Sequence, residues 1–216
     1  MATSRVVFVF SLDDQDLFQE IHGRLMNTIA QKAVVKQAAN FQEALNLLNS
    51  DTKPEAIFVT DSGITTARNN LVSEKLVDFV RSGGRVVLGG LFSSFVRPDD
   101  LRRYFKKTWN LPWKVGSYHR TTVALNQNAK GLPSSNLPSS YSQKAVFLAD
   151  VNSSAAWYLP TEDSVVESHV FAPVSVATSE TPVVFAEVGT GWLGYIGSVN
   201  SEEETDTVVL GMLGLL

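Results

Sequence analysis

Two serines and one histidine are the residues whose chemistry could support catalysis. Ser93 and Ser94 follow the glycine pair Gly89-Gly90, and His119 lies further along the chain on an expected strand. A serine hydroxyl becomes a nucleophile when a base within hydrogen-bond reach accepts its proton. The spacing around the serines departs from G-x-S-x-G, the pattern of a nucleophile on a sharp strand-to-helix turn. One hypothesis is therefore a hydrolase that uses Ser93 with His119 as its base.

Other reactive side chains are poorly placed for further chemistry. His22 is expected on the exposed side of a helix, and His169 lies in an irregular acidic stretch. Glu202 to Glu204 and Asp206 begin a helix, where the carboxylates diverge and stabilise the helix N-terminus instead of enclosing a metal. Gly89-Gly90 lacks the Lys-Ser/Thr pair of a phosphate-binding loop. We therefore expect neither a metal nor a cofactor.

Composition narrows the class of protein. The chain has no cysteine, which excludes disulfides, thiolate metal sites and cysteine nucleophiles. A length of 216 residues predicts one domain spanning 1–216, and 44% hydrophobic with 19% charged residues excludes a disordered chain. The absence of a long apolar run or a signal peptide predicts a cytoplasmic protein without membrane contact. The net charge of −4 argues against nucleic-acid binding, and the basic residues near 97–107 are expected on a solvated helix face.

The elements that must position these residues begin with four strand–helix units. Short β-branched runs predict strands at 5–10, 33–38, 56–60 and 85–88. Apolar residues at helical spacing predict helices at 17–29, 41–48, 71–81 and 99–109. Asn40 is expected to cap the second helix. Successive strand–helix units predict a parallel sheet with helices on both faces.

The second half of the chain has a different pattern. An extended segment is expected at 113–125, a long loop or excursion at 126–142, and a buried strand at 145–149. Apolar runs at 182–188 and 192–196 flank Gly189-Thr190-Gly191, which is typical of a hairpin. Acidic residues after Ser201 predict a closing helix. These elements complete a single α/β domain.

A ligand crevice is expected where the strands end. Open α/β sheets bind ligands beyond the carboxyl ends of their strands. The residues that this rule brings together are Ser11, Asp61, Ser62, Gly89, Gly90, Leu91, Phe92 and Asn200. Each type also has an ordinary structural role, since serine caps helices, aspartate opens turns and glycine allows close packing. A small-ligand or sugar-binding module at this crevice is a second hypothesis.

Two segments resemble a known family. In the segment Val80-Arg81-Ser82-Gly83-Gly84-Arg85-Val86-Val87-Leu88-Gly89-Gly90-Leu91-Phe92, a helix ends at a glycine pair, a strand follows and a sharp turn comes next. The segment from Pro182 to Asn200 reads as apolar strand, G-x-G, apolar strand and G-x-x-N. Both resemble class I glutamine amidotransferase-like proteins, especially the trehalose-utilisation-type branch. The resemblance implies a flavodoxin-like α/β fold with a C-terminal β-hairpin and a closing helix.

The departures from that family concern its catalytic residues. Active amidotransferases carry cysteine at the sharp turn, with His and Glu two positions apart near the end of the domain. Here the turn lies around Gly90-Leu91-Phe92, and the C-terminal region reads Gly197-Ser198-Val199-Asn200-Ser201-Glu202 without histidine. The resemblance therefore implies a catalytically degenerate protein without glutaminase activity. We expect a binding, scaffold or oligomer-forming protein, and relatives suggest homo-oligomerisation by fold analogy.

Overall fold

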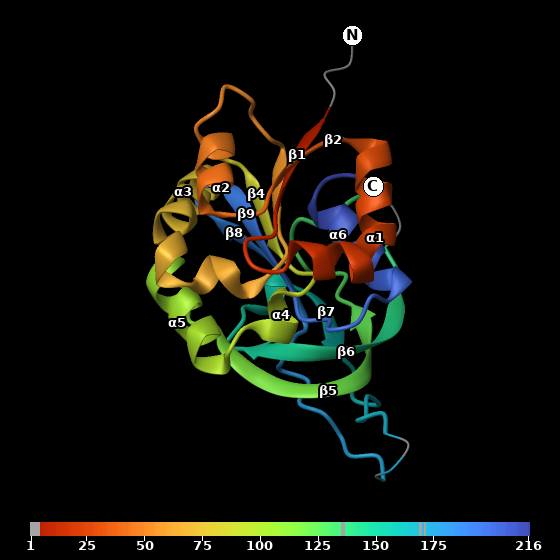
Figure 1. Cartoon of the computed structure of the whole chain (residues 1–216). Coiled ribbons are helices and arrows are strands. Elements are labelled where there is room, and N and C mark those ends of the chain that lie inside the picture. Colours follow the sequence, from red (N-terminus) through yellow and green to blue (C-terminus); the bar gives the residue numbers. More distant parts are fainter. Residues whose placement is uncertain (1–4, 135–136, 169, 171) are drawn as a thin grey trace.

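The computed structural model describes residues 5–134, 137–168, 170 and 172–216. Over these residues the chain forms one nine-stranded sheet in the order β2-β1-β3-β4-β9-β8-β7-β5-β6 (Figure 1). The strands are β1 Val6–Phe10, β2 Val34–Ala38, β3 Ala56–Val59, β4 Arg85–Leu88, β5 Lys114–Leu125, β6 Ser140–Ala149, β7 Ala156–Pro160, β8 Val183–Val188 and β9 Gly191–Ile196. The helices are α1 Gln15–Lys32, α2 Phe41–Leu48, α3 Asn70–Arg81, α4 Phe92–Phe95, α5 Pro98–Thr108 and α6 Glu203–Met212, with 3-10 turns η1 Ser62–Thr65, η2 Ala67–Asn69 and η3 Ser153–Ala155.

The sheet is mixed, which corrects the prediction of a parallel sheet. Strands β2, β1, β3, β4 and β9 are joined to one another by parallel pairs. Strands β9, β8, β7, β5 and β6 are joined to one another by antiparallel pairs. The physical reason is connectivity, because a parallel pair needs a crossover segment, and between β5 and β9 the only helical element among the described residues is the short turn η3. The α/β class is confirmed, but the parallel part covers only half of the sheet.

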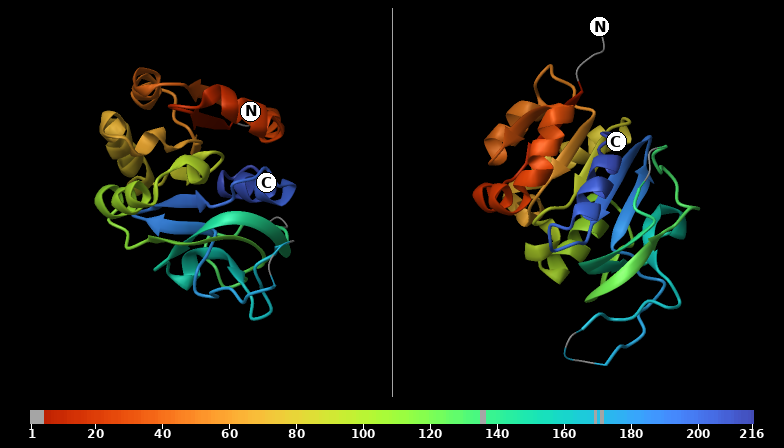
Figure 2. Two further views of the ribbon diagram at one scale, coloured as in Figure 1. Left: turned by 60° about the horizontal axis from the view of Figure 1, so that its bottom comes forward. Right: turned by 90° about the vertical axis from the view of Figure 1, so that its right-hand side faces the viewer.

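Helices cover both faces of the parallel half. Successive residues of β1 point to opposite faces, so Phe8 and Phe10 pack with α2, α3 and α5, whereas Val7 and Val9 pack with α1 and α6. The two views in Figure 2 show these helix layers on either side of the sheet. Both faces of β1 are therefore buried, which explains its unbroken apolar sequence.

The antiparallel half curls back on the end of β9. In the middle of β6, Val146 N donates to Gly197 O at 2.9 Å, and Val199 N donates to Lys144 O at 2.9 Å. A further bridge joins Leu148 to Thr181 just before β8. This curvature is visible in the left view of Figure 2. It brings the segment after β9 against β6, close to the turn that follows β4.

The expected excursion at 126–142 is partly a strand. β6 begins at Ser140, where it pairs with Ala124 of β5. In the described part of the preceding loop, Lys130 O accepts a hydrogen bond from Trp157 Nε1 at 2.9 Å. Residues 135 and 136 of the excursion lie outside the described residues. Within the described ranges, no helix is long and apolar enough to cross a bilayer.

Candidate functional site

The turn after β4 has no side chain at its centre. Gly90 joins β4 to α4 and has a φ of +60°, a left-handed conformation that favours glycine. A Cβ atom at this position would lie 2.7 Å from Cε2 of Phe18 and 3.2 Å from the carbonyl oxygen of Thr60. The aromatic ring of Phe18, from α1, therefore fills the space that a side chain on the turn would need.

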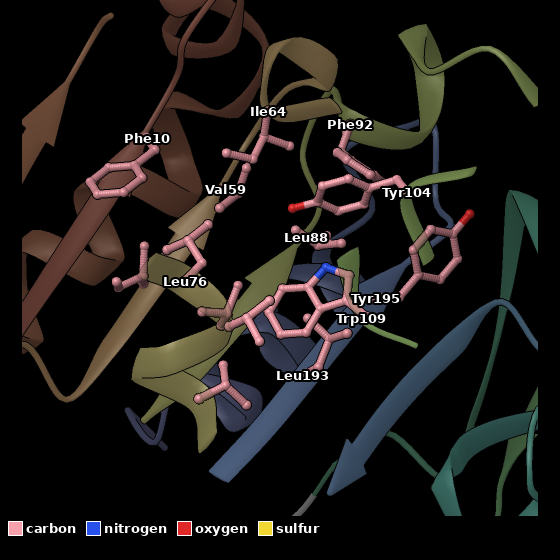
Figure 3. Packing of buried hydrophobic residues seen from close by; sticks show 14 of the residues in the cluster. Phe10, Val59, Ile64, Leu76, Leu88, Phe92, Tyr104, Trp109, Leu193 and Tyr195 are labelled. Atoms are coloured by element: carbon pink, nitrogen blue, oxygen red, sulfur yellow. The ribbon is translucent and has the colours of Figure 1, made fainter. Parts of the chain in front are cut away.

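Leu91 and Phe92 contribute to the core. Both side chains are buried, and the ring of Phe92 lies 6.5 Å from that of Tyr104 and 6.4 Å from that of Tyr195. Figure 3 shows the rings of Phe92 and Tyr104 above Leu88, with the ring of Tyr195 to one side. Phe92 packs between α5 and the sheet, whereas Leu91 belongs to the cluster on the opposite face, with Phe18 of α1 and Val208 of α6.

The polar candidates Ser11 and Asp61 are hydrogen-bonded to nearby residues of the segments after β1 and β3. Ser11 Oγ lies 2.7 Å from Thr60 Oγ1 in a buried hydrogen bond. Asp61 Oδ2 accepts from Asp13 N at 3.0 Å, and Asp61 Oδ1 accepts from Gly63 N at 2.9 Å. These contacts fasten the loop after β1 to η1. Ser62 is the half-buried first residue of η1. At this end of the expected crevice, the side chains of Ser11 and Asp61 are therefore already hydrogen-bonded within the protein.

Burial dominates the electrostatics of Asp61. Its side chain is inaccessible to solvent, which disfavours the ionised form and raises the pKa to about 6. Hydrogen bonds from the backbone amides of Asp14 and Gly63 act in the opposite direction but are outweighed. The carboxyl group therefore titrates well above the 3.8 of an exposed aspartate.

We expect Asp61 to make stability fall as the pH rises. The folded protein holds this proton to about pH 6, whereas the unfolded chain loses it near 3.8, so stability declines between these values. The loss is at most about 3 kcal/mol, from the pKa difference at about 1.4 kcal/mol per unit. Urea unfolding of the wild type and Asp61→Asn from pH 4 to pH 7 measures it. The variant should gain stability relative to the wild type over this range, and parallel curves would contradict the assignment.

The structure does not bring Ser93 and His119 together. Ser93 is buried, and its Oγ donates to Ile196 O at 2.7 Å. The ring of His119 stacks on Phe147 at 4.6 Å, and its buried Nε2 has no hydrogen-bond partner in the described part of the chain. Burial lowers the pKa of His119. Neither side chain contacts the other, so the nucleophile–base pair of the hydrolase hypothesis is not formed.

A pocket of about 530 Å³ lies beside α4, where α5, β5, β6 and the segment after β9 meet. Its lining consists of Ser93, Ser94, Val96, Pro98, Leu101, Val115, Tyr118, Lys144, Val146, Val199 and Asn200. Ser93, Ser94 and Asn200 are candidates from the sequence, whereas Tyr118 and Lys144 are not. Alternation along β5 places Tyr118 on the face opposite His119, a signal already present in the sequence. The contribution of Lys144 depends on the long-range pairing of β6 and could not be read locally.

Lys144 is the charged residue of this lining. Its Nζ lies 5.2 Å from the centroid of the Tyr118 ring, within the range of a cation–π contact. Among the described residues Lys144 forms no salt bridge. Most of the remaining lining side chains are aliphatic, so the pocket combines apolar walls with one cation.

The segment at which the resemblance implies the family's His and Glu forms a hydrogen-bonded network here. Glu202 Oε1 accepts from Arg120 at 2.9 Å, and Glu202 Oε2 accepts from Ser198 Oγ at 2.7 Å. The Glu202 side chain is only 15% exposed. Its carboxylate thus joins β5 to the start of α6. Over the residues that the structure describes, no group of histidine and acidic side chains could hold a metal ion.

The prediction that His22 is a surface residue is wrong. α1 is kinked at His22, where φ is −110° and ψ is 20°. The kink turns His22 inward to stack on Phe18 at 5.1 Å and leaves Ile21 43% exposed. Burial lowers the pKa of His22. His22 thus backs the ring that fills the turn at Gly90.

Comparison with solved structures shows proteins of similar fold. The fold is similar to that of a ThuA-like protein from Bacteroides uniformis, with a TM-score of 0.57 and 9% identity over 98% of this chain and 91% of that chain. The likeness expected from the sequence is therefore confirmed at the level of the fold. No protein-family model and no curated protein matches the chain.

The same fold occurs as part of larger enzymes. A β-galactosidase from the haloarchaeon Halorubrum lacusprofundi gives a TM-score of 0.56 at 17% identity, covering 99% of this chain and 30% of that chain. A β-galactosidase from Bacillus circulans gives 0.55 at 12% identity, covering 97% of this chain and 30% of that chain. The chain thus spans less than a third of these enzymes, and the likeness concerns the fold alone.

Proposed function

We propose that this protein is a non-catalytic member of the glutamine amidotransferase-like class that binds a small molecule beside α4. The observation that carries the proposal is the turn at Gly90, which has no side chain and is filled by Phe18. The hydroxyl of Ser93 is bound to Ile196 O, so it is not poised for attack on a substrate. Covalent catalysis requires an activated nucleophile, and this turn supplies none.

The pocket supports binding as the remaining activity. Its volume of about 530 Å³ falls within the range of about 300–1,000 Å³ that is usual for small-molecule sites. Its polar groups, such as Ser94, Asn200 and Lys144, stand among apolar walls. This combination of a mainly apolar surface with a few polar groups is typical of ligand pockets.

Two measurements test the proposal. Ammonia release from glutamine and hydrolysis of a p-nitrophenyl ester should both stay at the rate of buffer alone. Turnover of either substrate that is lost in Ser93→Ala would overturn the non-catalytic assignment, because the hydroxyl would then act in the reaction.

Binding is tested by ligand-observed NMR with a fragment library. Ser94 is exposed and lines the pocket, so Ser94→Trp should fill the pocket and remove the signals of bound fragments. Ser153→Trp, at an exposed position outside this lining, is the matched control. Fragments that bind equally well to the wild type and Ser94→Trp would refute a ligand site beside α4.

A further inference from the structure

The lining of the pocket beside α4 divides into an apolar part and a cationic part. Val96, Leu101, Val115, Val146 and Val199 supply aliphatic walls. Lys144 supplies a positive charge, and the lining contains no aspartate or glutamate. An uncompensated ammonium group in a mainly apolar pocket attracts an anion and repels a cation.

The geometry around Lys144 leaves its ammonium group available. Its contact with the face of Tyr118 satisfies the charge only in part, because an ammonium has three donors and an aromatic ring accepts none as a conventional hydrogen bond. In the described chain no carboxylate lies within salt-bridge distance of it. The side-chain amide of the exposed Asn200, on the same lining, offers a further donor.

We infer that the pocket binds a small carboxylic acid with an apolar chain, with its carboxylate at Lys144 and its chain along the aliphatic wall. This inference rests on the proposed binding function and names the class of ligand. A charge-assisted hydrogen bond holds the carboxylate, and burial of methylene groups supplies most of the affinity. A ligand that lacks the carboxylate loses the charge-assisted hydrogen bond, and a ligand that lacks the apolar chain loses the affinity from methylene burial.

A homologous series of acids tests the apolar part. Isothermal titration calorimetry with butanoate, hexanoate and octanoate at neutral pH should show affinity that rises about fourfold for each methylene that enters the pocket. Acetate should not bind measurably. Affinity that does not change with chain length would overturn the inference, since the walls would then make no contact.

Removal of the charge tests the cationic part. Octanamide, the neutral analogue, should bind the wild type about tenfold more weakly than octanoate does. Lys144→Met, which keeps an apolar stem, should show the same loss for octanoate, and Lys144→Arg should retain most of the affinity. Lys106→Met, at an exposed lysine of α5 outside the lining, is the matched control and should bind like the wild type.

The outcomes separate this inference from the function on which it rests. If octanamide binds as well as octanoate and Ser94→Trp blocks both, the pocket binds ligands but the carboxylate assignment is wrong. If neither the acids nor the fragments show binding that Ser94→Trp abolishes, the binding function fails and the ligand class fails with it.

Discussion

Replacement of Gly197 by alanine is expected to destabilise the protein by about 3 kcal/mol or more, at or beyond the upper end of the usual range for overpacking. A Cβ atom at Gly197 would lie 2.1 Å from Val146 O and 3.0 Å from Pro182 O. Both contacts are with backbone atoms, so no side-chain rotation can relieve them. The substitution must separate β6 from the segment after β9. Urea unfolding monitored by circular dichroism measures the loss.

Gly23→Ala is the matched control for this substitution. A Cβ atom at Gly23 would meet nothing within 4 Å, and the residue lies inside α1. Alanine there should stabilise the protein by about 0.5–1 kcal/mol, because glycine is the poorer helix former. If Gly197→Ala stays within about 1 kcal/mol of the wild type, the close approach between β6 and β9 is not present in solution.

Gly90→Ala is expected to cost about 2–4 kcal/mol. The left-handed conformation of an alanine accounts for about 1–2 kcal/mol of this, and the contact with Phe18 accounts for the rest. The unfolding free energy from urea titration is the measurement. The result bears on function, because a side chain at this turn is what a catalytic relative would need.

A double-mutant cycle separates the two contributions. In a Phe18→Leu background, Gly90→Ala should cost less than in the wild type, because the smaller side chain leaves room for the new methyl group. The cost of holding alanine in the left-handed backbone conformation is the same with phenylalanine and with leucine at position 18. Equal costs with and without Phe18 would show that the aromatic ring does not occupy the turn.

The parallel half of the fold could be predicted closely because its signals are local. The strand at 85–88 and the helix at 41–48 have the predicted bounds. Asn40 caps that helix as expected, with its side chain accepting from Glu43 N at 3.0 Å. A strand buried on both faces is an unbroken apolar run, and a helix cap is decided within four residues.

The antiparallel half was less predictable because its strands depend on distant partners. β7 was missed, since its five residues end in a proline and begin beside a serine-rich turn. The first half of β6, Ser140 to Lys144, is mostly polar and becomes a strand through its register with β5. Pairing between segments far apart in sequence leaves little trace in either segment alone.

In the candidate site, too, the features set by local sequence could be predicted and those set by long-range pairing could not. The rule for open α/β sheets brings Ser11 and Asp61 to the same end of the sheet, but it cannot show that Ser11 is hydrogen-bonded to Thr60 and Asp61 to the amide of Asp13. The pocket beside α4 takes Tyr118 from β5 and Lys144 from β6. Its composition follows from the curl of the antiparallel half, which no local pattern encodes.

That curl also limits how copies of the chain could assemble. Residues 144–148 of β6 have backbone partners on both sides, so half of this border strand is already paired. At the other border, β2 pairs only with β1 among the described strands, and Val34 there is 47% exposed. Because the whole of β2 is open on one side, strand addition between two copies is favoured there, and it would join β2 to β2 across a twofold axis. In such a dimer the unpaired backbone groups of both β2 strands are hydrogen-bonded to each other. No β2 edge then remains for a third copy, so the assembly does not extend into a fibre.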